Sequence, residues 1–444
     1  MCTDSRSVEP GELFVALVGE RFDGHDFVAD PAAAGAAGAV VSRPPDEIEG
    51  LRIYPVDDTL QALGRLARFR RRRLSARVVG ITGSSGKTTT KDLVRGALEP
   101  AYRVHATRGN LNNRIGLPRT VLDAPDETQV LVLEMGTNEP GEIAILTSIA
   151  EPGYGVVTTV SETHLEKLES LEGVLAEKLD LLRGLGEPGV GVVSDEPPVL
   201  AEAARAASER VRVAGWSRAA DPDLRPGSPE ADDRGCFRFR WRDETVTLRI
   251  PGRHAVQNAL LALAVADELE VDASAAARGL GTVEPPSMRG EIRRVGKLTL
   301  ILDCYNANPQ SVRAALEVLG AYPASGPRIA VLGTMLELGG ERDRLHREVL
   351  SDALARPLDL IVATGAFAEA AREAAAGDEG GPALVAADDP EEAYPLLRER
   401  LEGREVVLLK GSRGVALERL LPLLERDFGG NDERPARSVA GEGA

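Results

Sequence analysis

The chain has few cysteines, few aromatic residues, no long apolar run and no excess of positive charge. Its three cysteines among 444 residues match no disulfide or metal-ligand spacing, which predicts a reducing compartment. No apolar run reaches the roughly 18 residues that a membrane span needs, and the polar start lacks a signal-peptide core. A net charge of -17 argues against nucleic acid as a general partner. We therefore expect a cytoplasmic protein, without membrane insertion or nucleic-acid binding, that is a monomer.

The most informative segment is residues 80–90, Gly-Ile-Thr-Gly-Ser-Ser-Gly-Lys-Thr-Thr-Thr, which follows a short valine-rich run. Glycines let backbone N–H groups approach phosphate oxygens, Lys87 supplies a positive charge, and Thr88 offers a hydroxyl to Mg²⁺. Because Ile81 stands where the longer phosphate-loop motif has glycine, the match is to the shorter Thr-Gly-x-x-Gly-Lys-Thr form. The alternative is that the Gly, Ser and Thr residues only form a turn between a strand and a helix and bind no phosphate. We expect ATP to contact Gly83, Ser84, Ser85, Gly86, Lys87, Thr88 and Thr89.

The apolar pattern predicts an α/β protein of three domains followed by a tail. Residues 1–76 form a small α/β module, and residues 77–282 alternate valine-rich strands with helices, as in a parallel sheet. An alternating stretch from Cys236 to Ile250 predicts an antiparallel hairpin there. Residues 283–428 repeat the strand and helix alternation and predict a Rossmann-like doubly wound domain. Residues 429–444 have little to bury and are expected to be disordered.

A basic run closes a helix that is predicted to start near Asp57. Five of the six residues in Arg68–Arg73 are arginines. Cations are favoured at a helix C-terminus by the helix dipole, so we interpret the run as solvated helix-end charge. Contact with a nucleic acid or a membrane is the alternative.

Two candidate ligands follow predicted strands. Glu134 ends the apolar run 130–133, and an acid at the end of a buried parallel strand is well placed to hold Mg²⁺ beside the phosphate loop. A solvated loop glutamate is the alternative. His164 follows a second predicted strand, 156–160, but a lone histidine is more often a surface or core residue than a ligand.

Lys178 lies within the apolar stripe of a predicted helix, residues 171–182. Burial of a lysine is costly unless its charge is paired or reaches solvent, and burial also lowers its pKa and makes it a nucleophilic amine. Three outcomes stay open: a snorkelling side chain, a salt bridge, or reaction with carbon dioxide to form a carbamate that could orient a second Mg²⁺.

Several further motifs resemble the Mur ligase family of ATP-dependent amide-bond-forming enzymes. They are the phosphate loop, the N-terminal segments 4–17 and 23–27, and the segments 109–118, 305–309, 335–339 with His346, and 410–413. The resemblance covers nearly the whole chain and is strongest to the member that adds a dipeptide. It implies a ligase of peptidoglycan precursor synthesis that joins D-alanyl-D-alanine to UDP-N-acetylmuramoyl tripeptide through an acyl phosphate, releasing ADP and phosphate.

The resemblance also implies roles for individual residues. It implies two Mg²⁺ ions, with Thr88, Glu134, His164 and a carbamylated Lys178 as ligands, and Lys87, Glu134, His164 and Lys178 as the catalytic set. Further residues implied around ATP are His254, Asn258, Arg289, Asp303, Tyr305 and Asn306. Those implied for the substrates are Ser5, Arg6, Asn112, Asn113, Lys410 and Arg413. For the last two, solvated charges and a helix cap are the alternative.

The chain departs from the family pattern at four places. Only Met1-Cys2-Thr3 precede the Asp-Ser-Arg motif of the N-terminal module, so we interpret that module as shortened, which bears on nucleotide-sugar binding. Ala255, Thr159 and Thr334 replace two asparagines and an acid that are usual in the family. None of these positions is Lys87, Glu134 or Lys178, so we expect the chemistry to be retained.

Amide synthesis explains why such residues are needed. A carboxylate is anionic and a poor acyl donor, whereas phosphoryl transfer from ATP gives it a good leaving group that an amine can displace. Two anions must meet, so catalysis consists mostly of positioning and electrostatics, and domain closure would exclude water. Two alternatives stay open: a family member that adds a single amino acid to the dipeptide precursor, and a regulator that binds ATP without making amide bonds.

Overall fold

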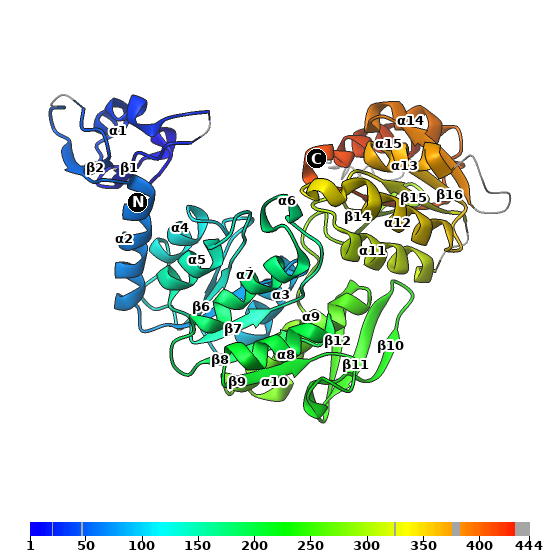
Figure 1. The fold of residues 1–444 in the computed structure, drawn as a ribbon, viewed down its shortest axis with the longest axis horizontal. Helices are drawn as coiled ribbons and strands as arrows, with labels where there is room; N and C mark the ends of the chain where they lie inside the picture. The colour runs from blue at the N-terminus through cyan, green and yellow to red at the C-terminus, as the bar shows by residue number, and fades with distance from the viewer. Residues whose placement is uncertain (20, 46–47, 324–325, 375–381, 431–444) are drawn as a thin grey trace, which may run out of the picture. The chain divides into compact units, whose positions relative to one another are not determined.

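The structure is a computed structural model that describes residues 1–444 except 20, 46–47, 324–325, 375–381 and 431–444 (Figure 1). The predicted disordered tail therefore lies outside the described residues from position 431. The chain forms two compact units. The first is Met1–Glu230 with Arg238–Leu248 and His254–Val283, and the second is Ala231–Phe237 with Arg249–Arg253 and Glu284–Ala444.

The N-terminal module is built on a three-stranded parallel sheet of order β1-β2-β3. Its strands are β1 (Leu13–Val15), β2 (Gly38–Val41) and β3 (Arg52–Pro55), with the short helices η1 (Ser5–Ser7), η2 (Gly24–Phe27) and α1 (Ala29–Ala33). These strands and helices confirm the predicted small α/β module. Strand β3 is not evident from the sequence, because only one of its four residues, Ile53, is packed against the module's apolar core.

The helix α2 (Thr59–Arg73) begins at the N-cap Asp58, whose carboxylate accepts backbone N–H groups, and ends in the basic run. The arginines are partly paired. Arg68 and Arg72 both bind Glu151, while Arg71 donates to the carbonyl of Ala150. Both acceptors stand at the C-terminal end of α5 (Glu142–Ala150). The basic run therefore attaches α2 to a neighbouring helix, which supports the helix-end interpretation and extends it.

The central domain contains a six-stranded, all-parallel sheet of order β5-β6-β4-β7-β8-β9. Its strands are β4 (Arg77–Thr82), β5 (Val104–Ala106), β6 (Val130–Glu134), β7 (Tyr154–Val157), β8 (Val190–Ser194) and β9 (Arg210–Ala214). Strand β4, which leads into the phosphate loop, lies between β6 and β7. The carboxyl ends of these three strands therefore meet at one edge.

One predicted strand was placed wrongly. The run 156–160 was expected to be a strand throughout, whereas β7 ends at Val157. The Thr158 N–H still donates to the Thr82 carbonyl of β4 at 2.9 Å. Beyond this bond the segment binds the phosphate loop: the Thr158 hydroxyl donates to the Ser85 carbonyl, and the Thr159 carbonyl accepts the Ser84 N–H. The competing contacts lie 73 residues apart in the chain, so local periodicity could not reveal them.

Helices cover the central sheet. They are α3 (Lys87–Leu98), α4 (Gly116–Leu122), α5, α6 (Leu165–Leu168), α7 (Leu171–Arg183), α8 (Pro198–Ala207), α9 (Arg253–Glu268) and α10 (Ala273–Leu280). Apolar residues of α4, α5 and α7 pack on β4 and β6 in one cluster, and α3 packs against α10. Strands β10 (Gly227–Ala231), β11 (Cys236–Trp241) and β12 (Glu244–Pro251) form a separate sheet, in which only Arg242 and Asp243 join β11 to β12, confirming the predicted hairpin.

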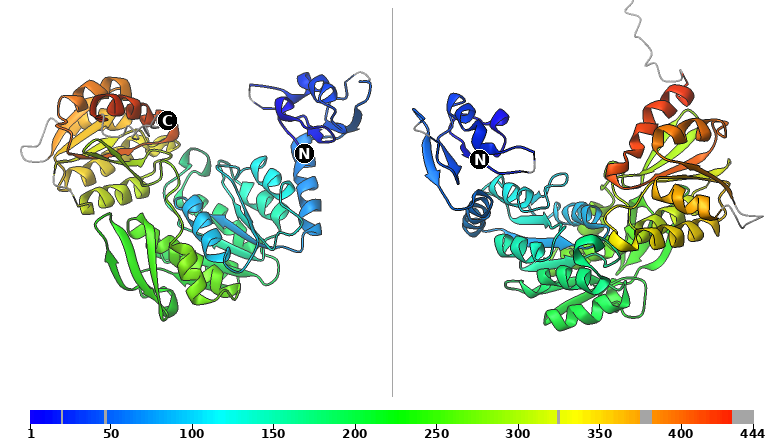
Figure 2. Two further views of the ribbon diagram at one scale, coloured as in Figure 1. Left: turned by 180° about the vertical axis from the view of Figure 1, so that it is seen from behind. Right: turned by 45° about the horizontal axis from the view of Figure 1, so that its top comes forward.

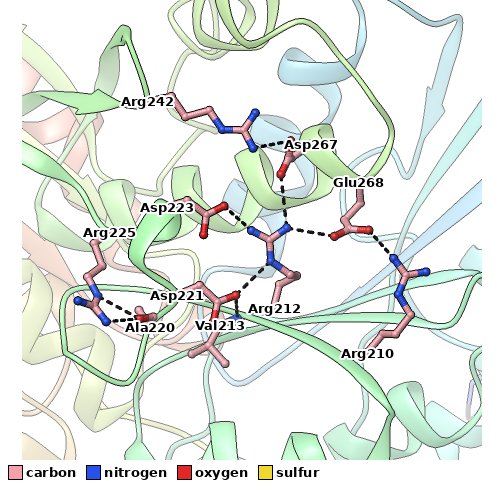
Figure 3. Close-up of polar contacts among 10 residues, drawn as sticks. All are labelled: Arg210, Arg212, Val213, Ala220, Asp221, Asp223, Arg225, Arg242, Asp267 and Glu268. Atoms are coloured by element: carbon pink, nitrogen blue, oxygen red, sulfur yellow. Dashed lines mark hydrogen bonds and ion pairs between the residues drawn. The ribbon is translucent and has the colours of Figure 1, made fainter.

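A charged cluster joins β9 to the end of α9 and to the hairpin turn (Figure 3). At its centre, Arg212 binds four carboxylates, those of Asp221, Asp223, Asp267 and Glu268. Arg210 shares Glu268, and Arg242 shares Asp267. We call this set the Arg212 cluster. It fastens segments that are distant in the sequence.

The C-terminal domain, coloured from yellow-green to red in Figure 2, has its own sheet. The sheet has six strands in the order β13-β14-β18-β15-β16-β17, in which β13 is antiparallel to β14 and the other pairs are parallel. Its strands are β13 (Glu291–Val295), β14 (Leu298–Asp303), β15 (Arg328–Leu332), β16 (Leu360–Thr364), β17 (Ala383–Ala387) and β18 (Val406–Lys410). The helices are α11 (Pro309–Ala321), η4 (Gly339–Glu341), α12 (Arg342–Leu354), α13 (Ala366–Ala374), α14 (Pro390–Arg398), η5 (Arg413–Val415), η6 (Leu417–Arg419) and α15 (Leu420–Phe428). The predicted doubly wound domain is confirmed.

Candidate active site

The phosphate loop runs from β4 to α3 and requires glycine at two positions. Gly83 and Gly86 have φ angles of 145° and 79°, which disfavour residues with a side chain. A Cβ atom on Gly83 would lie 2.0 Å from the Thr158 hydroxyl, and one on Gly86 would lie 2.9 Å from the amide oxygen of Asn258. The loop is therefore closely enclosed by neighbouring segments, while the first turn of α3 presents backbone N–H groups at the positive end of the helix.

Lys87, the first residue of α3, folds back over the loop. Its Nζ donates to the carbonyl of Gly83 at 2.6 Å. Thr88 and Thr89 follow on the same turn and are buried. The ammonium group and the helix terminus thus provide positive charge at one place, as the sequence predicted for a polyphosphate site.

Residues after β7 hold the loop in place, and the sequence analysis did not single them out. The Ser84 hydroxyl accepts bonds from the Ser161 N–H and the Thr163 hydroxyl, both at 3.0 Å. The Thr158 hydroxyl donates to the Ser85 carbonyl at 2.5 Å. A cluster of Ser and Thr directly after a strand that neighbours the phosphate-loop strand was the available signal. These hydroxyls restrict the loop before any ligand arrives.

Glu134 ends β6 beside the loop, in register with Ile81 of β4. Its side chain is buried, and its Oε1 accepts a hydrogen bond of 2.8 Å from the Asn112 amide. Its Oε2 is buried and has no hydrogen-bond partner in the described part of the chain. The solvated alternative is therefore wrong. A buried carboxylate oxygen without a donor is a suitable position for a cation.

Lys178 is fully buried on α7, and its Nζ has no hydrogen-bond partner within the described ranges. Burial first, and then the positive charge of Lys87, hold the pKa of Lys178 well below its usual 10.5, although Glu177 and Glu142 act in the opposite direction. The snorkelling outcome is excluded by the burial, and Lys178 forms no salt bridge with any residue that the structure describes. The lowered pKa of Lys178 favours the unprotonated, nucleophilic form of the amine.

Its neighbour Glu177, which the sequence analysis passed over, is buried and fully engaged. Its carboxylate accepts the Thr137 hydroxyl at 3.1 Å and the N–H groups of Gly141 and Ile143 at 2.7 and 2.8 Å. The last two belong to the start of α5. Glu177 therefore anchors the turn that follows Glu134, and its position next to Lys178 on α7 was the only signal in the sequence.

His164 lies in the segment that follows β7, three residues after Ser161, and is the N-cap of α6 with a positive φ of 55°. The structure thus brings its backbone to the edge where the phosphate loop lies. Within the described ranges, no three His, Cys, Asp or Glu side chains form a group that could hold a metal ion. The role of His164 as a metal ligand stays a prediction.

The predicted nucleotide residues on α9 differ in their surroundings. Asn258 is buried against the phosphate loop, as its closeness to Gly86 requires. His254 stands on the exposed first turn of the same helix. Helix α9 therefore places one predicted residue in direct contact with the loop and leaves the other at the surface.

The predicted residues of the C-terminal domain form two groups. Lys410 at the end of β18 is buried, pairs with Asp303 at 2.8 Å and donates to the carbonyl of Asn306 at 2.9 Å. The guanidinium of Arg289 stacks over the Tyr305 ring at 4.0 Å. These contacts overturn the solvated alternative for Lys410. Arg413 is exposed and pairs with Glu418, so for it the alternative stays open.

His346 fixes the Met335–Gly339 segment of the same domain. It is buried on α12, where its Nε2 accepts the Met335 N–H at 2.9 Å and its Nδ1 lies 2.6 Å from the carbonyl of Arg342. Burial lowers the pKa of His346. A neutral ring with its proton on Nδ1 satisfies both contacts.

The remaining predicted residues lie in local structure. Arg6 is exposed and forms an ion pair with Asp4 at 2.7 Å, next to Ser5 in η1. Asn113 is exposed and accepts the N–H groups of Ile115 and Gly116, the latter at 2.8 Å, at the start of α4. The contacts of Arg6 and Asn113 are compatible with a structural role and leave their predicted substrate contacts untested. Among the described residues, no helix is long and apolar enough to span a membrane.

Three family models match successive parts of the chain. They are the Mur ligase family, catalytic domain, over residues 1–71; the Mur ligase middle domain over residues 81–266; and the Mur ligase, glutamate ligase domain, over residues 288–413. Together they follow the order of the three predicted domains.

Curated relatives and solved structures resemble the whole chain. The UDP-N-acetylmuramoyl-tripeptide--D-alanyl-D-alanine ligase of Bacillus subtilis (strain 168) is 35% identical over 423 residues, which are 95% of this chain and 92% of that protein. The Escherichia coli (strain K12) protein of the same name is 35% identical over 436 residues, 96% and 93% of the two chains. A crystal structure of MurF from Acinetobacter baumannii matches with a TM-score of 0.87 and 34% identity, covering 96% of this chain and 93% of that one. MurF from Thermotoga maritima in complex with ADP matches with a TM-score of 0.83 and 30% identity, covering 96% and 97%.

The phosphate loop, the strand-end carboxylate and the buried lysine thus occur in a chain that resembles these proteins along almost its entire length. By the three family models and by relatives 35% identical over more than nine-tenths of its residues, the chain belongs to the Mur ligase family.

Proposed function

We propose that the protein is an ATP-dependent ligase that adds D-alanyl-D-alanine to UDP-N-acetylmuramoyl tripeptide in peptidoglycan precursor synthesis. The observation that carries the proposal is that one domain contains the phosphate loop, Glu134 and Lys178, in a chain whose relatives bear that activity in their names. Among the described residues, one carboxylate oxygen of Glu134 and the Nζ of Lys178 have no hydrogen-bond partner. The reaction takes place in the cytoplasm, where ATP and the nucleotide-linked precursor are available.

In the proposed reaction the tripeptide carboxylate attacks the γ-phosphorus of ATP, and ADP leaves. The resulting acyl phosphate accepts the amine of D-alanyl-D-alanine at its carbonyl carbon; phosphate leaves and the amine loses a proton. Lys87 and the N–H groups of α3 stabilise the phosphate charge that develops. The hydroxyl contacts of Thr158, Ser161 and Thr163 hold the loop in this geometry, which lowers the reorganisation needed during reaction.

Magnesium fits the residues present. The free Oε2 of Glu134 and the hydroxyl of Thr88 are hard oxygen donors of the kind that Mg²⁺ prefers. We propose that they would hold the first ion, and that His164 and a modified Lys178 would hold a second. When bound, the ions supply positive charge that screens the repulsion between the two reacting anions.

We propose that Lys178 is carbamylated. Its neutral Nζ would attack the carbon of carbon dioxide to form an N–C bond and would lose a proton, which gives an anionic carbamate. The modification would replace a buried amine, which has no hydrogen-bond partner among the described residues, by two oxygens able to bind a cation. The low pKa of Lys178 favours the step, because only the unprotonated amine is a nucleophile.

We also propose a division of labour among three domains. Residues 1–76 would bind the uridine part through Ser5 and Arg6, residues 77–282 would bind ATP and the metal ions, and residues 283–428 would form the Rossmann-like ligase domain. The family models support these limits, since they match residues 1–71, 81–266 and 288–413. The residues proposed to contact ATP outside the loop are His254, Asn258, Arg289, Asp303, Tyr305 and Asn306, and those proposed for the acceptor substrates are Asn112, Asn113, Lys410 and Arg413.

The test is a reconstituted reaction with purified protein, ATP, Mg²⁺, UDP-N-acetylmuramoyl tripeptide and D-alanyl-D-alanine. We expect phosphate release that requires both substrates, and a product whose mass equals their sum less one water. Activity only with the dipeptide precursor and a single amino acid would assign the other adding step. Phosphate release that depends on neither substrate, or ATP binding with no product, would overturn the proposed ligase function.

A further inference from the structure

Lys91 is a buried lysine on the phosphate-loop helix, and the proposed mechanism does not use it. It lies on α3 four residues after Lys87 and therefore on the same face of the helix. We infer that Lys91 is a positioning residue that sets the cation affinity of Glu134, because it fixes the backbone to which Glu134 is bound. The inference deepens the proposed function. It rests on that function only for the catalytic role of the bound cation, and the cation affinity itself can be measured without the reaction.

The first step is the contact of Lys91 itself. Its side chain is 5% exposed, and its Nζ donates to the carbonyl of Thr107 at 2.9 Å and lies 3.1 Å from a carboxylate oxygen of Asp92. Burying an ammonium group is costly without such partners. The helix that carries the phosphate site is thereby attached directly to the residue that follows β5.

The second step leads from Thr107 to the backbone of Glu134. The Thr107 N–H donates to the Val132 carbonyl at 3.0 Å, and its hydroxyl accepts the N–H of Glu134 at 3.0 Å. Thr107 is buried, so no water competes for these groups. If the Thr107 carbonyl lost its bond to Lys91, Thr107 could shift. Its hydroxyl, which holds the backbone N–H of Glu134, would then move with it.

The third step concerns the Glu134 carboxylate. The loop that starts at Thr107 carries Asn112. Its side-chain amide donates to Oε1 of Glu134 at 2.8 Å, and its backbone carbonyl accepts the Gly136 N–H at 2.8 Å. Glu134 is thus held at its backbone by Thr107 and at its carboxylate by Asn112. The loop leaves only Oε2 without a partner in the described part of the chain, and it determines where that oxygen points. Partners beyond the direct ligands orient metal sites in this way.

The experiment measures Mn²⁺ affinity in the presence of ADP by electron paramagnetic resonance, with the full-length protein. In K91M the stem remains and the ammonium is lost, and we expect Mn²⁺ affinity to fall about tenfold, the lower end of the effect of such partners. The same substitution in an E134Q background should change the affinity less than about twofold, because Lys91 acts through Glu134. An equal loss in both backgrounds would show a merely structural role and would overturn the inference.

Two further variants complete the test. In D92N the bond from Lys91 to Thr107 is retained, so Mn²⁺ affinity should equal that of the wild type. In T107V the hydroxyl that accepts the Glu134 N–H is lost, so affinity should fall as in K91M, and this variant carries the test if K91M does not fold. Unchanged Mn²⁺ affinity in T107V, or in a folded K91M variant, would overturn the inference. Since no acceptor substrate is present, failure of ligation in the wild type would count against the proposed function alone.

Discussion

Two basic side chains of the central domain, the partly buried Arg212 and the buried Lys178, have opposite surroundings. Arg212 binds four carboxylates and lies in a cluster where each charge drawn has a partner (Figure 3). Lys178 is fully buried and has no hydrogen-bond partner in the described residues. Paired charge fastens segments together, whereas unpaired buried charge lowers stability unless a ligand or a modification completes it. The contrast separates a structural site from a reactive one.

The carboxylates show the same contrast. Glu177 accepts three donors and anchors the start of α5. Glu134, at the end of β6, uses one oxygen and leaves the other without a donor in the described part of the chain. Both are buried. The number of satisfied oxygens, and not burial, therefore distinguishes the anchor from the candidate ligand.

The largest expected effect is the loss of Lys178. In K178A, kcat should fall by about 10³-fold, because the proposed carbamate and its charge are removed. Added formate or acetate should restore part of the activity. The exposed Lys297, replaced by alanine, is the matched control and should leave kcat unchanged. Steady-state kinetics with both substrates measure the effect, and full activity of K178A would exclude Lys178 from the mechanism.

A smaller loss is expected at Glu134. In E134Q, kcat should fall by about 10²-fold, because a neutral amide replaces the anionic oxygen offered to the cation while the volume is kept. Excess Mg²⁺ should recover part of the rate. E139Q, in the exposed part of the following turn, is the control. An E134Q variant with the wild-type dependence on Mg²⁺ would contradict the assignment.

A substitution in the Arg212 cluster should lower the stability of the fold and leave the catalysed reaction unchanged. R212M removes the shared partner of four carboxylates, and we expect the free energy of unfolding to fall by about 2 kcal/mol, less than for a fully buried pair because Arg212 is 22% exposed. Urea titration measures the change. Activity per folded molecule should stay at the wild-type value, and a specific loss of kcat would place the cluster in the active site.

The buried amine of Lys178 should also shape the pH dependence of stability. The pKa of Lys178 is lowered in the folded state, so below the unfolded value of 10.5 the unfolded chain binds the extra proton. The free energy of unfolding should therefore rise with pH up to about 10.5, by at most about 1.4 kcal/mol per pH unit from this group, and lose that contribution as pH falls toward the folded pKa. Urea titrations in buffer free of carbon dioxide should show this slope in the wild type and its absence in K178M; equal slopes would contradict the assignment.

The smallest effect sharpens the comparison within the Arg212 cluster. Arg242 is 42% exposed, pairs with Asp267 and stacks on Trp241. R242A should lower the free energy of unfolding by about 0.5 kcal/mol, as is usual for an exposed pair. A loss as large as that of R212M would show that the rim and the centre of the cluster act as one unit.

Much of the fold could be predicted because the strands of both six-stranded sheets are short apolar runs with clear ends. The strand β6, for example, begins at Val130, where the predicted apolar run 130–133 begins. The strand after residue 154 ends early, and β3 was missed, since in both cases contacts distant in the chain outweigh the local pattern. Glu134 was foreseen from its position after a buried strand. Glu177 and the hydroxyls of 158–163 were not, because only their partners give them a role.

The sequence by itself determined the phosphate loop, the succession of domains, the family and the presence of a lysine on an apolar helix face, since all of these depend on residue types at fixed spacings. Only the tertiary structure decided that, within the described ranges, the Nζ of Lys178 and one carboxylate oxygen of Glu134 have no hydrogen-bond partner, and that Lys91 reaches Thr107. Whether a buried polar group is satisfied depends on atoms contributed by other elements. That information appears only when the chain has folded.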